Sequence, residues 1–325
     1  MRPSEESVEA LRFSSLNDEA PLVRRSAIEA LGDIGLPLAF KATDALVAAL
    51  KDPSSDLRES AANSLAKLGP SLCNADILKS LKLMLKDNLW KVRYSACGCI
   101  ASYGDKAKDC LQELLKVLVH GTVLRTHVAM AIAALGEDGE KALIDILVQQ
   151  STTFGIQVRK SAAFGLGSID LTRVPVPRIE AIIEKLFDVS SDSRPILRAA
   201  VLSALGALGR KANETITYVK APSLLSFFYS FMKDKDKSVR ETAAQLIARS
   251  GSSQAGELLL IEAAMKDSNS LIRTSAVHGL YWVGPRSVRT VLLALRDQEE
   301  FVRKVIILCI LFYYFSYLEF FYYYF

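Results

Sequence analysis

The chain has 325 residues, of which 50% are hydrophobic and 23% are charged. Its 40 lysines and arginines nearly balance its 36 aspartates and glutamates, and such a mixed charge argues against a surface built mainly to bind a polyanion. Only three histidines are present, which limits metal and acid–base chemistry. Five cysteines, and ten initial residues without the pattern of a secretory leader, predict an intracellular, reducing compartment, the cytoplasm.

One arginine recurs along the chain in the same local pattern, at steps of 30 to 42 residues. An aliphatic residue stands immediately before each of these arginines and another stands seven positions after it. Asp lies six positions before the arginine in seven of nine cases, and Gly lies eleven positions after it in seven. This register indicates internal repeats. The nine positions are Arg24, Arg58, Arg93, Arg125, Arg159, Arg198, Arg240, Arg273 and Arg303.

Each repeat is expected to contain two helices. Apolar residues at −1, +3, +4 and +7 from the arginine form the buried stripe of an amphipathic helix, here called helix B. The Gly at +11 suits the left-handed position that ends it. Before the Asp, a second apolar-periodic segment predicts helix A, clearest over 39–51, 77–86, 142–149 and 256–266. The sequence therefore predicts an all-α chain of helix A, a turn with Asp, and helix B.

The spacing of Asp and Arg, with the recurring Ala, Leu and Gly positions, resembles the HEAT-repeat family in its short, bilin-lyase-type form. The resemblance covers the chain from Ser7 to Val305. It implies a right-handed, armadillo-like α-solenoid of about nine repeats, eight complete and one interrupted. It implies little about function, because one solenoid serves many purposes.

The conserved spacing of Asp and Arg within the repeats predicts a structural ladder of ion pairs between turns. The other interpretation is a row of arginines that binds phosphate groups, but the Asp partners that accompany the arginines favour the ladder. Each Asp is expected either to cap free N–H groups or to accept from the arginine of its own or a neighbouring repeat. The predicted ladder comprises Asp18, Arg24, Asp52, Arg58, Asp87, Arg93, Asp192, Arg198, Asp234, Arg240, Asp267 and Arg273. Val119 and Thr153 stand where the fourth and fifth repeats would have Asp.

Three segments depart from the pattern. Residues 170–177 and 209–220 lengthen two steps and are expected to be loops, which either bend the array, contact a partner or are simply tolerated. The third segment, 305–325, follows a solenoid predicted over 1–304, and 11 of the residues at 312–325 are aromatic. It is interpreted as a gene-model artefact, a membrane tail anchor or a hydrophobic cap. Glu319 argues against the anchor, and the lack of a polar face argues against the cap.

No catalytic, cofactor or metal site is predicted. His120 and His127 are seven residues apart, too far for one metal on a single helix. No histidine is followed by Glu, so the iron-binding His-Glu pairs of deoxyhypusine hydroxylase, a short-HEAT enzyme, are missing. The cysteines lack metal-ligand spacing and are expected to be small buried side chains.

The exposed ridge of helix B should lie at +1, +5 and +9 from the arginine. On this ridge Tyr94, Met130 and Phe164 predict an apolar strip with Lys160 beside it, and His278 with Trp282 forms a second aromatic spot. We therefore expect a non-catalytic scaffold or adaptor that holds a protein or peptide in a concave groove across repeats three to six. Nucleic-acid binding and a lyase-type enzyme are the alternatives. Alternating charges on the ridge argue against nucleic acid.

Overall fold

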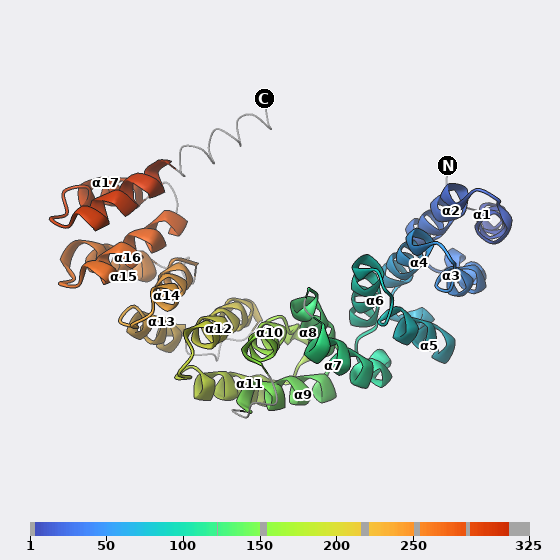
Figure 1. Cartoon of the computed structure of the whole chain (residues 1–325), viewed down its shortest axis with the longest axis horizontal. Coiled ribbons are helices and arrows are strands. Elements are labelled where there is room, and N and C mark those ends of the chain that lie inside the picture. The colour runs from blue at the N-terminus through green and yellow to red at the C-terminus, as the bar shows by residue number, and fades with distance from the viewer. Residues whose placement is uncertain are drawn as a thin grey trace. The chain divides into compact units, whose positions relative to one another are not determined.

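A computed structural model describes residues 4–121, 123–149, 155–215, 221–249, 254–283 and 287–311. The regular elements of these residues are all helices, which confirms the predicted fold class. The chain divides into two compact units, Met1–Val174 and Pro175–Phe325, here called unit 1 and unit 2 (Figure 1). In each unit, helices pair as A and B helices in the manner of an α-solenoid.

Unit 1 contains five helix pairs, and its B helices pack side by side in chain order to form one layer (Figure 1). Each A helix packs on the B helix of its own repeat. The A helices are α1 (Glu5–Asn17), α3 (Thr43–Ala49), α5 (Ala75–Met84), α7 (Leu111–His120) and α9 (Glu137–Val148). The B helices are α2 (Pro21–Ile34), α4 (Ser55–Leu68), α6 (Trp90–Tyr103), α8 (Arg125–Ala134) and α10 (Ile156–Gly167). Four 3-10 segments, η1 (Leu38–Ala42), η2 (Pro70–Leu72), η3 (Gly104–Cys110) and η4 (Leu171–Arg173), lie between helices.

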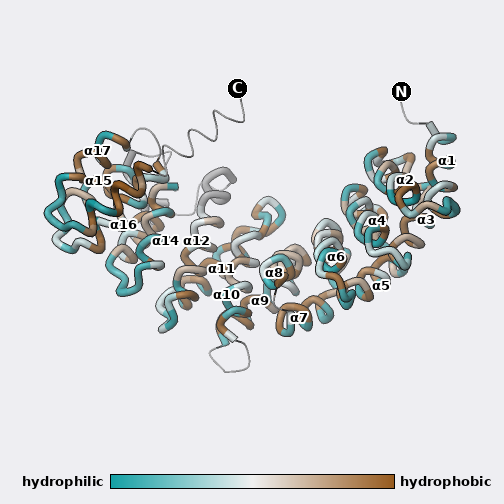
Figure 2. Tube along the Cα trace, turned by 45° about the horizontal axis from the view of Figure 1, so that its top comes forward, coloured by the Kyte–Doolittle hydropathy of each residue, from teal (hydrophilic) through white to brown (hydrophobic). Residues whose placement is uncertain are grey.

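Unit 2 repeats the same arrangement, with α12, α14 and α16 packed in sequence. Its A helices are α11 (Val176–Val189), α13 (Ala221–Phe231), α15 (Gln254–Lys266) and α17 (Val288–Ala294). Its B helices are α12 (Pro195–Thr215), α14 (Lys237–Arg249), α16 (Ser270–Val283) and a final helix over 300–311. Hydrophobic residues recur on the helices of both units (Figure 2). Buried hydrophobic residues lie on the A and B helices of both units.

The second repeat shows how the sequence pattern produces this structure. Leu57, Ala61 and Leu65, at −1, +3 and +7 from Arg58, are at most 1% exposed. One turn of helix separates positions three or four residues apart, so these side chains share the face that packs inward. Gly69 ends α4 with a φ of 78°, a left-handed conformation that glycine adopts without a steric cost.

Adjacent B helices approach closely where their facing residues are small. A Cβ placed on Gly165 of α10 would lie 2.7 Å from the carbonyl oxygen of Ala129 on α8. Real side-chain atoms do not approach a carbonyl this closely, so glycine is required for the spacing between these two helices. The short distance between helices brings the exposed ridges of neighbouring repeats together into one surface.

The prediction of a loop over 209–220 is wrong for its first part, because α12 continues through Gly209 to Thr215. Gly209 is buried, and a Cβ there would lie 2.9 Å from Leu224 of α13. This glycine therefore serves a close approach between helices and not a helix end. The segment predicted as a loop at 170–177 contains η4 and the start of α11, whose first turn accommodates Pro177.

The last helix continues without a break across 304 and 305, and Val302 and Ile306 on it are both buried. Its end at 311 leaves 312–325, most of the predicted aromatic segment, outside the described residues. In the part of the chain that is described, no helix has both the length and the hydrophobicity needed to cross a bilayer.

Candidate interaction surface

Seven of the recurring arginines donate hydrogen bonds to backbone carbonyl groups in the turn of their own repeat. In each, Nη1 donates to the carbonyl oxygen of the residue six positions earlier and to the next carbonyl along the chain. Arg58, for example, donates to the carbonyl oxygens of Asp52 at 2.8 Å and Pro53 at 2.9 Å. These carbonyl groups follow the end of helix A and have no hydrogen-bond donor within that helix. The guanidinium therefore satisfies acceptors that would otherwise lack a partner. The same contact is made by Arg24, Arg93, Arg198, Arg240, Arg273 and Arg303.

Several of these arginines also bind the Asp carboxylate of the following repeat. Arg198 donates from Nε at 2.8 Å and from Nη2 at 2.7 Å to Asp234, a bidentate pair with both side chains at most 10% exposed. Arg273 pairs with the next repeat in the same way, through Asp297 at 2.6 and 2.9 Å. The shared pattern links Arg24 to Asp52, Arg58 to Asp87, Arg198 to Asp234 and Arg273 to Asp297.

Seven arginines therefore bind the backbone carbonyl at the Asp position of their own repeat, and four of them, Arg24, Arg58, Arg198 and Arg273, also bind the carboxylate of the next Asp. Each of these carboxylates also accepts the backbone N–H two residues further on, as Asp234 does from Asp236 at 2.8 Å. Hydrogen bonding from Arg273 lowers the pKa of Asp297. At Asp234, burial acts to raise the pKa, but the hydrogen bond from Arg198 and the Asp236 N–H outweigh it and the pKa is lowered.

The ladder changes where the fourth and fifth repeats lack Asp. Val119 falls within the last turn of α7, and Arg125 donates from Nε to the Leu118 carbonyl oxygen at 3.2 Å. Arg159, only 1% exposed, donates to the Leu147 carbonyl oxygen at 2.9 Å. Within the described residues, Arg93 has no carboxylate of the following repeat as a partner.

The predicted apolar strip consists of Tyr94, Met130 and Phe164, and the structure places these residues on α6, α8 and α10, three adjacent helices. Tyr94 is 44% exposed, Met130 is 43% exposed and Phe164 is half-buried. None of these three side chains belongs to the layer between A and B helices. They form a surface on the B helices, which we call the apolar strip.

Two polar side chains, His127 and Lys160, contact the aromatic rings of the apolar strip. His127 of α8 meets Tyr94 edge to face, with ring centroids 4.7 Å apart. Nζ of Lys160 lies 5.8 Å from the Phe164 ring centroid, a distance at which a cation is attracted to a ring face. The contact of His127 was not predicted, because His127 is at +2 and not on the ridge expected from the sequence. Gly98, the middle ridge position of α6, is exposed and has open space around it.

On the first two repeats, the ridge consists of ion pairs. Arg25 and Glu29 of α2 pair at 2.8 Å, and Asp33 of α2 pairs with Lys67 of α4 at 2.6 Å. Glu29 also accepts a hydrogen bond from Ser60 across the two helices. These four ridge charges are therefore held in ion pairs within the protein.

The second predicted spot lies on unit 2. Trp282 is 42% exposed, and its Nε1 donates to Nε2 of His278 at 3.4 Å. The guanidinium carbon of Arg249 lies 4.5 Å from the Trp282 ring. The predicted ridge is wrong at Thr274, which is 4% exposed. The hydroxyl of Thr274 donates to the Ser270 carbonyl oxygen, and this hydrogen bond satisfies the hydroxyl although it is buried.

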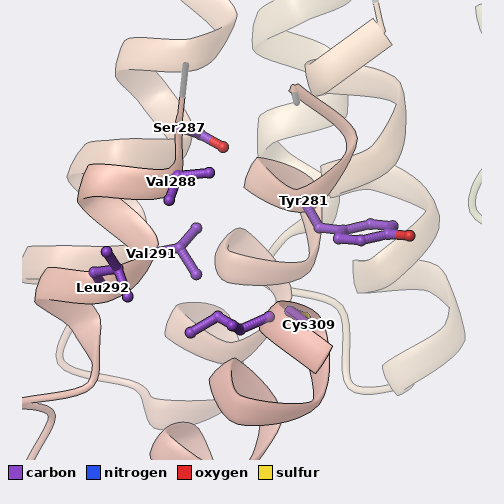
Figure 3. A pocket seen from close by; sticks show the side chains of 7 residues that line it. Tyr281, Ser287, Val288, Val291, Leu292 and Cys309 are labelled. Atoms are coloured by element: carbon purple, nitrogen blue, oxygen red, sulfur yellow. The ribbon is translucent and has the colours of Figure 1, made fainter. Parts of the chain in front are cut away.

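Unit 2 also has an apolar pocket of about 170 Å³ (Figure 3). Val288, Val291 and Leu292 of α17 form one side of it, and Tyr281 and Cys309 approach from the other helices. The hydroxyl of Ser287 at its edge donates to the Leu280 carbonyl oxygen at 2.6 Å. Such a pocket can accept an apolar group but offers little to orient a polar one.

The reactive side chains are arranged for packing. All five cysteines are free thiols. Burial raises the pKa of Cys97 and Cys99 to about 12 and that of Cys110 to about 11, so these thiols stay protonated at neutral pH. His120 and His127 belong to different helices, α7 and α8, and not to one helix as their spacing was taken to mean. Over the described ranges, no three His, Cys, Asp or Glu side chains are placed to hold a metal ion.

No curated protein matches the chain. Among solved structures, an engineered protein of the Northeast Structural Genomics Consortium is 18% identical, with 94% of this chain and 87% of its own covered and a TM-score of 0.41. Another engineered protein of that consortium is 20% identical, with 62% and 98% covered and a TM-score of 0.39. A designed armadillo repeat protein is 18% identical, with 61% and 98% covered and a TM-score of 0.38.

The family described as HEAT repeats matches residues 8–82, 43–133 and 224–310. Together these segments include about two-thirds of the sequence and fall in both units. They contain the ladder arginines from Arg24 to Arg93 and from Arg240 to Arg303, whose contacts are described above. The chain therefore belongs to the HEAT-repeat family.

Proposed function

We propose that this protein is a non-catalytic scaffold or adaptor whose B-helix face in unit 1 binds a protein or peptide partner. The observation that carries the proposal is the presence of Tyr94 and Met130, both exposed, and of Phe164, half-buried, on three adjacent helices. Repeat folds of this family are typical of proteins that bind other proteins. The free cysteines accord with an intracellular, reducing location, which forms part of the proposal.

The apolar strip has the chemistry of a binding surface. Burial of apolar area contributes about 25 cal/mol per Å² before the entropic costs of association. An aromatic ring and a flexible thioether can contact an amphipathic helix or an extended segment without a specific hydrogen-bond pattern. Because helix packing already fixes α6, α8 and α10, little order must be gained by the scaffold on binding.

The two other candidate functions have less support. Nucleic-acid binding needs a continuous row of available cations, but Arg25 and Lys67 pair with acids, and Arg58 and Arg198 are used in the ladder. A lyase-type enzyme would need reactive groups in a pocket, and the described pocket in unit 2 is lined almost entirely by apolar side chains.

The test is capture of cellular proteins by the full chain and by a Met130→Asp/Phe164→Asp variant. A charge on the apolar strip should remove the partner while the helices remain folded, which circular dichroism checks. Leu83→Asp on α5, where Leu83 is 59% exposed, is the matched control and should retain the partner. A partner that binds all three proteins equally would contradict the proposed site.

A further inference from the structure

The three helices that carry the apolar strip have basic but no acidic residues. Helices α6, α8 and α10 contain no Asp or Glu, but they contain five lysines and arginines. By contrast, α4, which packs on α6, and α2, which packs on α4, each carry two acids. The basic residues of the strip helices are Lys91, Arg93, Arg125, Arg159 and Lys160.

The ladder lacks the Asp that would follow Arg93 and the Asp that would follow Arg125. Its Asp positions are occupied by Val119 and Thr153 in the fourth and fifth repeats, so the carboxylates that elsewhere bind the arginines are replaced there. Arg159 is buried against the Leu147 carbonyl and does not reach the surface. Lys91 is exposed, whereas Arg93 and Lys160 are half-exposed.

The cations lie at one end of these helices. Lys91, the second residue of α6, and Lys160, the fifth residue of α10, lie near the N-terminal ends of their helices, where the helix dipole adds positive potential. Two acids flank α6 in the sequence. Asp87, before α6, pairs with Arg58, and Asp105 lies beyond the C-terminal end of α6. Among the described residues, the ion pairs do not include Lys91, Arg93 or Lys160.

Resting on the proposed function, we propose that the partner segment is an acidic amphipathic peptide. Its apolar side chains contact Tyr94, Met130 and Phe164, and its carboxylates lie toward Lys91 and Lys160. The position of Lys160 over the Phe164 ring supports an acidic amphipathic peptide. A peptide carboxylate bound to Lys160 would hold the neighbouring apolar side chain of the peptide within contact distance of the Phe164 ring. A nucleic acid fits less well, since its phosphates would have to follow a surface whose centre is apolar.

The experiment selects displayed random 16-residue peptides on the full-length protein. Each selected peptide is then measured against the Met130→Asp/Phe164→Asp variant and against Lys91→Glu/Lys160→Glu. Lys79→Glu/Lys116→Glu, which changes two exposed lysines on α5 and α7, is the control of equal charge. We expect selected peptides that carry several Asp or Glu residues among apolar ones. Their affinity should fall at least tenfold in Lys91→Glu/Lys160→Glu, less than threefold in the control, and further as salt is raised.

Two other results separate this inference from the proposed function. Peptides that need Met130 and Phe164 but have no excess of acids, or that bind Lys91→Glu/Lys160→Glu unchanged, would overturn the acidic partner and leave the scaffold standing. A selection without any peptide that depends on Met130 and Phe164 would overturn both. A 30-nucleotide DNA that binds more tightly than every selected peptide, and loses binding only in Lys91→Glu/Lys160→Glu, would assign the cations to nucleic acid instead.

Discussion

At the scale of single residues, the bidentate pair of Arg198 and Asp234 gives the ladder its main energetic consequence. Arg198→Ala would leave the Asp234 carboxylate, 10% exposed, without its guanidinium. An uncompensated buried charge costs about 3–5 kcal/mol, so the variant should unfold at a clearly lower urea concentration. Urea unfolding of the full-length parent and variant, followed by circular dichroism, measures this loss as a lower urea midpoint for the transition of unit 2.

An exposed ion pair provides the control for that prediction. Asp33→Ala removes the partner of Lys67, and these side chains are 67% and 54% exposed. Solvent screens such a pair, so we expect a change of less than about 1 kcal/mol. Equal effects of Asp33→Ala and Arg198→Ala would mean that burial does not govern the ladder.

Buried thiols predict a loss of stability in alkali. Burial raises the pKa of Cys97 and Cys99 from about 9 to about 12. The unfolded chain therefore releases these protons first, and stability that is fully present below pH 9 is lost as the pH rises toward 12. Each thiol contributes a slope of up to about 1.4 kcal/mol per pH unit.

Unfolding in urea between pH 8 and pH 10.5 measures that slope. Cys97→Ala/Cys99→Ala should show a flatter dependence on pH than the parent protein, whatever its stability at pH 8. If the two proteins lose stability in parallel, other groups ionise on unfolding in this range and the assignment to these thiols is wrong.

At the scale of helices, two glycines on the B helices predict opposite effects of the same substitution. Gly165→Ala would place a Cβ 2.7 Å from the carbonyl oxygen of Ala129 and push α8 and α10 apart, with an expected cost of about 1–3 kcal/mol. At Gly98, on α6, a Cβ meets no atom within 4 Å, so Gly98→Ala should stabilise the helix by about 0.5–1 kcal/mol. Thermal unfolding distinguishes the two, and a stabilised Gly165→Ala would contradict the close approach.

The helices could be predicted from the sequence because one burial pattern is repeated beside every arginine. The same register leaves Tyr94 and Met130 exposed in the structure, although their role in binding stays a prediction. The contact of His127 with Tyr94 could not be predicted, since it depends on the distance between two helices. Gly209 was misread because the sequence cannot distinguish a glycine that ends a helix from one that admits a neighbour such as Leu224.

At the scale of the whole molecule, the division at Val174 predicts that unit 1 folds alone. Repeats of a solenoid contact mainly their sequence neighbours, so the five helix pairs of 1–174 keep most of their partners after separation. A protein of residues 1–174 should be helical, unfold cooperatively and bind the same peptides as the full chain. Circular dichroism and peptide binding measure both properties. A 1–174 protein without cooperative unfolding would show that its stability depends on unit 2.

The ladder also bears on how an array of this kind can change its length. Arg24 reaches Asp52, and Arg58, one repeat later, reaches Asp87 through the same atoms and the same turn. A gene duplication that copied the second repeat would place an arginine in the preceding repeat for each new aspartate and an aspartate in the following repeat for each new arginine. Growth by whole repeats therefore needs no compensating mutation at the joints, whereas insertion of part of a repeat separates an arginine from its carboxylate. In the evolution of such a chain, the repeat and not the residue is the neutral unit of gain and loss.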